Sequence, residues 1–307
     1  MPYDDSFRGH EVWKLRKYSI ALPNGPDGFE NALRDNAATV AANTVGATHN
    51  KALSGLYLTD WKAAVASDGV ERVSLEKLSR TPATGGTFTT KKHSIVLRFV
   101  DAGGFLCHFL PWDDRGGAVY MELDDSGPNI FFTAALSGCS VMVDGNADNP
   151  TVYHFGCETW TDSNYVEAGN VGPPMNETHQ LWEDLFRHHA GHAPQHLIDK
   201  RNYVNDFNPN FTTANSRQFE TQCQNDKGDP AAQALPWGIV FGLRDDNDDW
   251  AFYLQENATF RYKKKEVKWS GLRPRRVRGQ FREQCRPMNL KQFFPAVVDN
   301  APRWTFG

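Results

Sequence analysis

Six short apolar runs between residues 94 and 156 set the strongest constraint on what this chain can fold into. Gly, Asp, Asn and Pro separate the runs, which recur at intervals of roughly ten to fourteen residues. No helical pattern of comparable length lies between them, which disfavours a fold of alternating strands and crossover helices. The spacing predicts an antiparallel sheet or sandwich built from SIVLRFVD, GGFLCHFLPW, GGAVYMELDD, NIFFTAAL, CSVMVDG and PTVYHFG.

Helical patterns flank these runs. Apolar residues spaced by three and four predict a helix over Phe29–Asn43, and residues 177–200 predict another that stops near Gly191 and Pro194. Because these patterns surround the strands, we expect one α+β domain over residues 1–307. Its centre is predicted to be an antiparallel or mixed β-sandwich flanked by helices, with N- and C-terminal extensions.

The C-terminal third reads as a hairpin followed by a basic tail. Residues 237–255 predict two apolar strands around the acidic turn Asp245–Asp249, and residues 257–272 predict a further strand. The last forty or so residues are basic and are predicted to be irregular, so we expect a basic extension over about residues 257–307. Two polar stretches, 77–93 and 203–236, are predicted to be loops.

Composition narrows the class of protein. Hydrophobic residues make up 40% and charged residues 23% of the chain, as in a globular protein. The net charge of -4 argues against a general polyanion binder, and we do not expect nucleic acid as a partner. No apolar run approaches the length of a membrane-spanning helix, so no membrane insertion is expected. The five cysteines are odd in number and form no C-x-x-C pair, which predicts reduced thiols and no metal site.

The stretch TAALSGCSVMVDGNADNPTVYHFG holds a candidate nucleophile and base. A thiolate is a nucleophile, and a nearby imidazole can accept the thiol proton. Cys139 opens one predicted strand and His154 ends the next, with a turn-rich loop between them. If the strands pair antiparallel, both residues reach the same edge, provided that their side chains share a face. The ordinary alternative is a small buried cysteine and a histidine satisfied by a backbone carbonyl.

The residues before Cys139 are candidates for an oxyanion hole. Ser137 and Gly138 predict a tight turn, and glycine allows a positive φ or another strained conformation there. Such a turn can aim backbone N–H groups at one point, where the oxyanion of a tetrahedral intermediate would form. The N–H of Cys139 is the first expected donor.

The LSGC turn, the strand after it and a second strand ending in His resemble the catalytic core of a toxin family. That family contains the cytotoxic necrotizing factors and the Burkholderia lethal factor, which are bacterial protein glutamine deamidases. The resemblance covers about residues 94–156 and implies Cys139 as the nucleophile and His154 as the base. Thr133 matches a threonine beside the active site in the lethal-factor branch. In the necrotizing-factor branch a backbone carbonyl orients the histidine, and its counterpart is expected somewhere in residues 94–123.

The resemblance implies a toxin or effector that converts one glutamine of a host protein to glutamate. Candidate targets are a Rho-family GTPase and a translation-initiation RNA helicase. The reaction needs no cofactor, and an amine in place of water would give transglutamination from the same thioester. The N-terminus lacks the pattern of a cleavable signal, so we expect secretion without one and action in the host cytoplasm, or else a cytoplasmic protein. A monomer is favoured.

Two alternatives stay open. A cysteine protease could use the same Cys–His pair, although the local papain-type signature is absent. Residues Arg261–Arg286 hold eleven Lys/Arg and two Glu, so the chain could be a binding module for RNA or an acidic protein surface. The spacing of the clustered histidines would suit a metal on a helix, but Gly191 and Pro194 interrupt that helix, so we expect a solvated, polar helix end there and no metal. The docking candidates are Lys263, Lys264, Lys265, Arg275 and Arg276, and the clustered histidines are His188, His189, His192 and His196.

Overall fold

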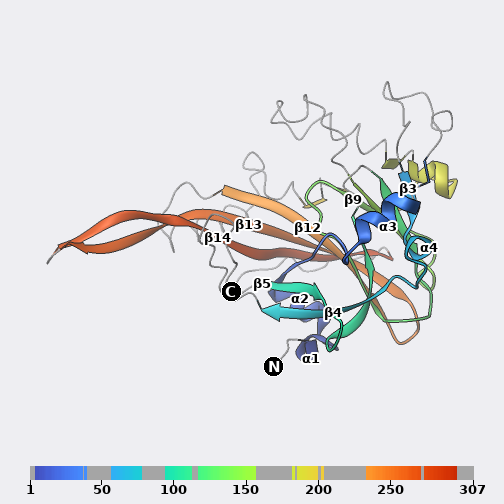
Figure 1. The fold of residues 1–307 in the computed structure, drawn as a ribbon, viewed down its shortest axis with the longest axis horizontal. Helices are drawn as coiled ribbons and strands as arrows, with labels where there is room; N and C mark the ends of the chain where they lie inside the picture. Colours follow the sequence, from blue (N-terminus) through green and yellow to red (C-terminus); the bar gives the residue numbers. More distant parts are fainter. Residues whose placement is uncertain are drawn as a thin grey trace, which may run out of the picture.

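Two β-sheets form the body of the protein, and a long hairpin projects from it (Figure 1). The structure is a computed structural model that describes residues 4–36, 38–39, 57–77, 94–112, 117–156, 182–183, 185–199, 202–203, 233–270 and 273–295. The helices are α1 (Asp4–Phe7), α2 (Glu11–Lys17), α3 (Phe29–Asn36) and α4 (Trp61–Val65). The strands are β1 (Ser19–Ala21), β2 (Ala38–Thr39), β3 (Tyr57–Asp60), β4 (Val70–Lys77), β5 (Ser94–Phe99), β6 (Phe105–Leu110), β7 (Ala118–Glu122), β8 (Ile130–Thr133), β9 (Ser140–Asp144), β10 (Thr151–Phe155), β11 (His196–Ile198), β12 (Gln233–Arg244), β13 (Trp250–Ser270) and β14 (Arg273–Phe294).

The sheets have eight and six strands. The larger sheet has the order β1-β5-β4-β6-β8-β12-β13-β14, and the smaller has the order β11-β9-β10-β7-β3-β2. Most neighbours are antiparallel, while β1–β5, β6–β8 and β3–β7 are parallel. The six strands predicted between residues 94 and 156 are confirmed as β5 to β10, and the α+β class with a mixed, sheet-rich centre is confirmed as well.

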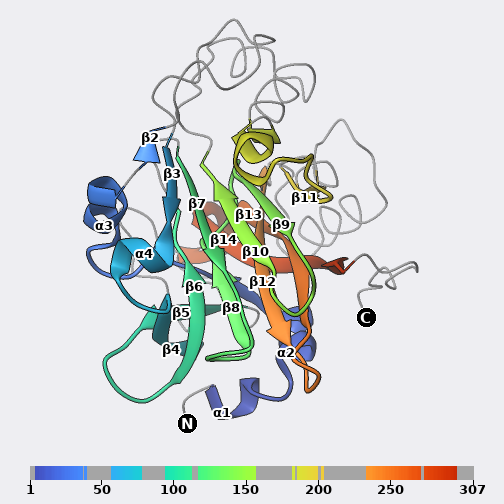
Figure 2. The same ribbon diagram turned by 90° about the vertical axis from the view of Figure 1, so that its right-hand side faces the viewer.

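The main core lies between the two sheets, which Figure 2 shows as two layers. Alternation along β9 explains the layering. Val141 and Val143 enter the core between the sheets, while Met142 packs on the opposite face with Trp182 and Phe186. Each buried side chain of this size contributes about 1.5–3 kcal/mol. Alternate residues of β9 therefore pack on opposite faces of the smaller sheet, as the alternation in the sequence predicts.

A second core fills the other face of the larger sheet, under the N-terminal helices. Phe7 of α1 and Leu15 of α2 pack there with Phe105 and Phe109 of β6. The side-chain amide of Gln255 in β13 donates hydrogen bonds to carbonyls of α2 and the residue after it. The buried amide thus joins the N-terminal segment to β13 of the same sheet.

The predicted helix over Phe29–Asn43 is correct only in its first half. It ends at Asn36, whose side-chain amide donates to the carbonyls of Ala32 and Ala64, and Ala38–Thr39 already forms β2. An asparagine that bonds to backbone carbonyls competes with helix continuation, and the β-branched Thr39 favours a strand. Residues 40–43 lie outside the described ranges.

The later helix and the acidic hairpin agree better with the sequence. Residues 185–190 are helical and Gly191 follows with a φ of 79°, so the predicted stop is confirmed. Asp245–Asp249 forms the tip of the β12–β13 hairpin, closed by a hydrogen bond from the Asp245 N–H to the Asp249 carbonyl. The predicted loops are wrong at two of their ends, because Lys77 belongs to β4 and residues 233–236 begin β12. Residues 78–93 and 204–232 lie outside the described ranges.

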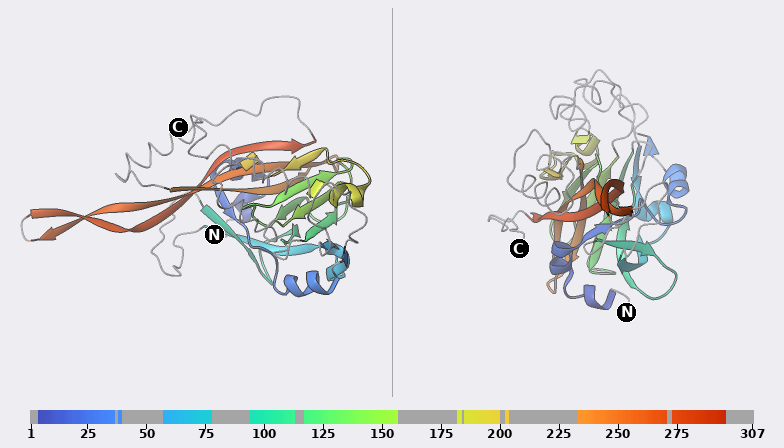
Figure 3. Two further views of the ribbon diagram at one scale, coloured as in Figure 1. Left: turned by 90° about the horizontal axis from the view of Figure 1, so that it is seen from above. Right: turned by 90° about the vertical axis from the view of Figure 1, so that its left-hand side faces the viewer.

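The predicted irregular tail is wrong over residues 273–294, while residues 296–307 lie outside the described ranges. Residues 273–294 form β14, which pairs with β13 along its length and extends the larger sheet. Beyond Arg261, which is the last register partner of β12, the described part of the chain gives β13 and β14 no third strand. There the two strands leave the body as a ribbon, seen from above in Figure 3.

Candidate active site

Cys139 lies where the chain crosses from one sheet to the other. Thr133 ends β8 in the larger sheet, and β9 in the smaller sheet begins at Ser140. Midway, Leu136 forms an isolated bridge with Gly238 through two backbone hydrogen bonds of 2.7 and 2.9 Å. The bridge fixes the middle of the crossing, so the LSGC turn has a defined position between the layers.

Ser137 and Gly138 form the bend before Cys139, as predicted from the sequence. Gly138 is not among the glycines that the described part of the chain holds at positive φ, so the left-handed conformation does not shape this bend. Tyr203, which is fully buried, donates its hydroxyl to the Cys139 carbonyl at 3.0 Å. A side chain from a distant segment thus holds the backbone of the candidate nucleophile.

A hydrogen-bond chain between the sheets orients His154. The Thr133 hydroxyl donates to the Leu110 carbonyl at 2.9 Å, and the same oxygen lies 2.6 Å from Nδ1 of His154. A hydroxyl has one proton, so Oγ1 must accept from Nδ1–H once it donates to the carbonyl. The network therefore assigns the neutral tautomer of His154 with its proton on Nδ1 and an open lone pair on Nε2.

Nε2 of His154 is buried and has no hydrogen-bond partner among the described residues. Burial lowers the pKa of His154 to about 3, so the ring is neutral near pH 7. Leaving a buried ring nitrogen unpaired costs about 1–3 kcal/mol. A neutral imidazole with an open lone pair can accept a proton, which is the first requirement for a general base.

The strand register brings His154 close to the segment that holds Cys139. His154 is the partner of Val141, and Cys139 lies two residues before Val141 in the same core cluster. Cys139 itself precedes β9 and lies outside the ladder, so its position beside this end of β10 follows from the core cluster that it shares with Val141. A direct hydrogen bond to Nε2 is not formed, because that nitrogen has no partner among the described residues.

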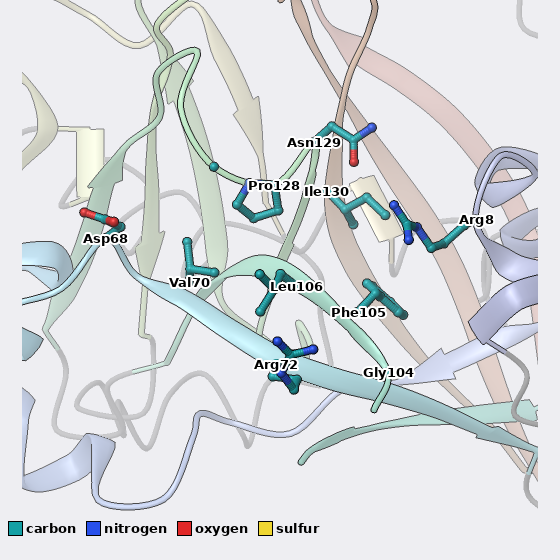
Figure 4. A pocket seen from close by; sticks show the side chains of 11 residues that line it. Arg8, Asp68, Val70, Arg72, Gly104, Phe105, Leu106, Pro128, Asn129 and Ile130 are labelled. Carbon is teal, nitrogen blue, oxygen red and sulfur yellow. The ribbon is translucent and has the colours of Figure 1, made fainter. Parts of the chain in front are cut away.

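The candidate site is closed. Cys139 is 2% exposed, and His154 and Thr133 are fully buried. A pocket of about 580 Å³ lies elsewhere, between β4, β6 and the segment before β8, with Arg8 and Arg72 on its sides (Figure 4). A second, of about 420 Å³, borders Trp61 and α3. Neither of these two pockets includes the thiol or the imidazole. Because Cys139 is buried, a substrate reaches it only after covering groups move.

The remaining predicted residues lie apart from this site. The docking candidates belong to the projecting parts of β13 and β14. In the described ranges no group of three side chains could hold a metal ion, and the histidine cluster is divided among other contacts. His192 pairs with Asp144 at 3.3 Å, and His196 lies 3.2 Å from the Phe293 carbonyl. No helix among the described residues is long and apolar enough to cross a membrane.

Two groups of the site have no signal in the sequence. The Leu110 carbonyl lies within the range 94–123 where an orienting carbonyl was expected, but a carbonyl has no residue-type signature. Tyr203 stands in a polar stretch predicted to be a loop, and no motif marks it. A scan against protein-family models and a search of curated proteins both found no match to the chain.

Proposed function

We propose that the protein is a Cys–His thiol hydrolase that deamidates a glutamine of a host protein. The observation that supports it most is the Leu110–Thr133–His154 chain, which leaves Nε2 of a neutral imidazole unpaired close to the segment that holds Cys139. A histidine kept only for packing would gain about 1 kcal/mol by bonding both nitrogens. Here one nitrogen is fixed and the other left open, as a general base requires.

The proposed reaction has two halves. In the first, Nε2 of His154 takes the proton of the Cys139 thiol while Sγ attacks the carboxamide carbon, and backbone N–H groups at the LSGC bend stabilise the oxyanion. The C–N bond then breaks, and the imidazolium gives its proton to the departing ammonia. A thioester remains between Sγ and the glutamine side chain.

In the second half, Nε2 removes a proton from water, which attacks the thioester carbonyl. The C–S bond breaks, the glutamate leaves, and the imidazolium returns the proton to Sγ. Thr133 acts as a positioning residue, because it holds Nδ1–H while Nε2 exchanges protons. Since Cys139 is buried and burial lowers the pKa of His154 to about 3, the reaction requires an opening step that admits the substrate side chain to Sγ and hydrates the ring, which raises its pKa toward the working pH.

The resemblance of the LSGC…His segment supports the choice of a carboxamide substrate and of a host protein as its source. Candidate targets are a Rho-family GTPase and a translation-initiation RNA helicase, reached in the host cytoplasm. Conversion of one glutamine to glutamate adds a negative charge, which can disable a catalytic glutamine or a contact surface.

The test is to incubate the protein with a host-cell lysate and search by mass spectrometry for glutamines that gain about one dalton, the change from an amide to an acid. The parent should produce such sites and Cys139→Ser should not. Cys285→Ser is the matched control, because Cys285 is a half-buried thiol on β14 that should be dispensable. Conversion that persists in Cys139→Ser would remove the thiol from the mechanism. Cleaved peptides in place of converted glutamines would indicate a protease.

A further inference from the structure

The β13–β14 hairpin concentrates positive charge on a part of the molecule that projects from the body (Figures 1 and 3). We name residues 262–270 and 273–282 the distal ribbon. The distal ribbon contains nine Lys/Arg and one Glu, a net charge of +8, in a chain whose total is -4. At about 3.3 Å per residue it extends roughly 30 Å. The distal ribbon is therefore strongly cationic although the net charge of the whole chain is negative.

The register of the distal ribbon places like charges directly opposite each other. Lys265 is the partner of Arg278, and Lys268 is the partner of Arg275. Like charges at opposed positions destabilise a strand pair, and a two-stranded ribbon is only marginally stable on its own. Stability of the hairpin therefore does not explain these residues, whereas an anionic ligand that neutralises them does.

Cationic residues stand at register positions of both faces of the distal ribbon. Because opposed residues share a face and successive residues alternate, three cations fall on each face of its outer half. A ribbon that docks flat on an acidic protein surface needs cations on one face only. Charge on both faces fits a ligand that surrounds the ribbon. The first face holds Lys265, Arg276 and Arg278, and the second holds Lys268, Arg273 and Arg275.

We infer that the distal ribbon binds double-stranded DNA by lying in its major groove. The major groove of B-form DNA is about 12 Å wide and admits a two-stranded β-ribbon, with phosphates along both walls. The major groove of double-stranded RNA is too narrow and deep for this. The expectation from net charge, that nucleic acid is not a partner, did not account for the separation of charge between the ribbon and the body. This inference is independent of the proposed deamidation.

The test measures binding of the full chain to a fluorescent DNA duplex of about two helical turns, by anisotropy, from about 50 to 200 mM salt. The dissociation constant should rise steeply and linearly on logarithmic axes. A variant with Lys265, Lys268, Arg275 and Arg278 changed to Gln should bind at least about 10-fold more weakly. Its salt slope should fall by about one for each phosphate that it no longer neutralises. Cys139→Ser should bind like the parent.

The matched control removes four exposed cations of the body: Arg16, Lys17, Arg34 and Arg187 changed to Gln. It should bind the duplex within about 3-fold of the parent, because it lowers the net charge equally without touching the ribbon. Equal weakening in both variants would overturn the assignment to the ribbon. Single-stranded DNA or duplex RNA bound as tightly as duplex DNA would contradict the groove fit. Poly-glutamate that competes equally per charge would indicate an acidic protein surface instead.

Discussion

The single residue on which the candidate site depends most is Thr133, although it does no chemistry itself. Its hydroxyl oxygen contacts a carbonyl of the larger sheet and the imidazole of the smaller sheet, so it joins the layers and sets the tautomer of His154. The sequence identified Thr133 through a resemblance, and Cys139 and His154 through thiol chemistry and hairpin spacing. It could not identify Leu110 or Tyr203, because their contributions come from backbone and tertiary contacts that no local pattern encodes.

Replacing Thr133 tests this link. Thr133→Val should lower the free energy of unfolding by about 1–3 kcal/mol, because it leaves Nδ1 of His154 buried without its partner, while the Leu110 carbonyl keeps only the N–H of Ala134. It should also abolish Cys139-dependent deamidation, since the tautomer is no longer fixed. Thr133→Ser is the control, which keeps the hydroxyl and should retain activity. Urea denaturation and glutamine mass spectrometry measure the two effects. Equal activity in both variants would show that the hydroxyl does not position His154.

The buried histidines predict how stability depends on pH. Burial lowers the folded-state pKa of His154 to about 3, against about 6.5 when unfolded. Above about pH 6.5 the ring is neutral in both states and contributes no pH dependence. As the pH falls from there toward 3, only the unfolded state takes up the proton, so the free energy of unfolding drops by about 1.4 kcal/mol per pH unit. His108, whose pKa burial lowers to about 4, adds a similar slope over the upper part of this range.

Urea denaturation at several pH values between about 4.5 and 6 measures this slope. His154→Gln should reduce it by about 1.4 kcal/mol per unit, whatever its effect at neutral pH. His10→Gln serves as the control, because His10 is exposed at the start of α2. An unchanged slope in His154→Gln would mean that the ring titrates in the folded protein, and the closed site would then admit water.

At the scale of elements, local pattern predicted which residues form strands but not how the strands pair. The apolar runs from 94 to 156 became β5 to β10 because alternation and turn residues are local signals. The neighbours of β8 are β6, in parallel, and β12, which lies far along the chain. The strand β14 was missed because its Arg, Lys, Pro and Gly residues have low strand propensity, and its pairing with β13 decides its conformation.

The turn between β5 and β6 offers a test with an internal control. Gly103 and Gly104 both have positive φ, of 74° and 62°. A Cβ on Gly103 would meet nothing within 4 Å, whereas one on Gly104 would overlap the Val73 carbonyl oxygen. Gly103→Ala should therefore cost only about 1 kcal/mol of backbone strain. Gly104→Ala should cost at least about 2 kcal/mol more, because the adjoining strand must shift. Similar unfolding midpoints for the two variants would contradict the tight β4–β6 packing.

At the scale of the whole molecule, the sandwich and the distal ribbon differ in what holds them. The core between the sheets contains residues of α3, α4 and strands from β6 to β14, whereas beyond Arg261 the described part of the chain gives the ribbon no third strand. The body without the ribbon has a net charge of -12, opposite in sign to the arm. The net charge of the whole chain therefore describes neither the body nor the distal ribbon, because a sum over the chain carries no information on where charges lie in space.

Removing the distal ribbon should separate folding from duplex binding. Arg261 and Glu283 are register partners, so an Asn-Gly turn can join them in place of residues 262–282 without changing the remaining ladder. The shortened chain should unfold in one transition with a free energy within about 1 kcal/mol of the parent, because it loses opposed like charges and keeps every residue of the described core clusters. Its affinity for the DNA duplex should fall below detection in the same anisotropy assay. A lower or multiphasic unfolding transition would place the ribbon in the cooperative unit and exclude an arm built for a ligand.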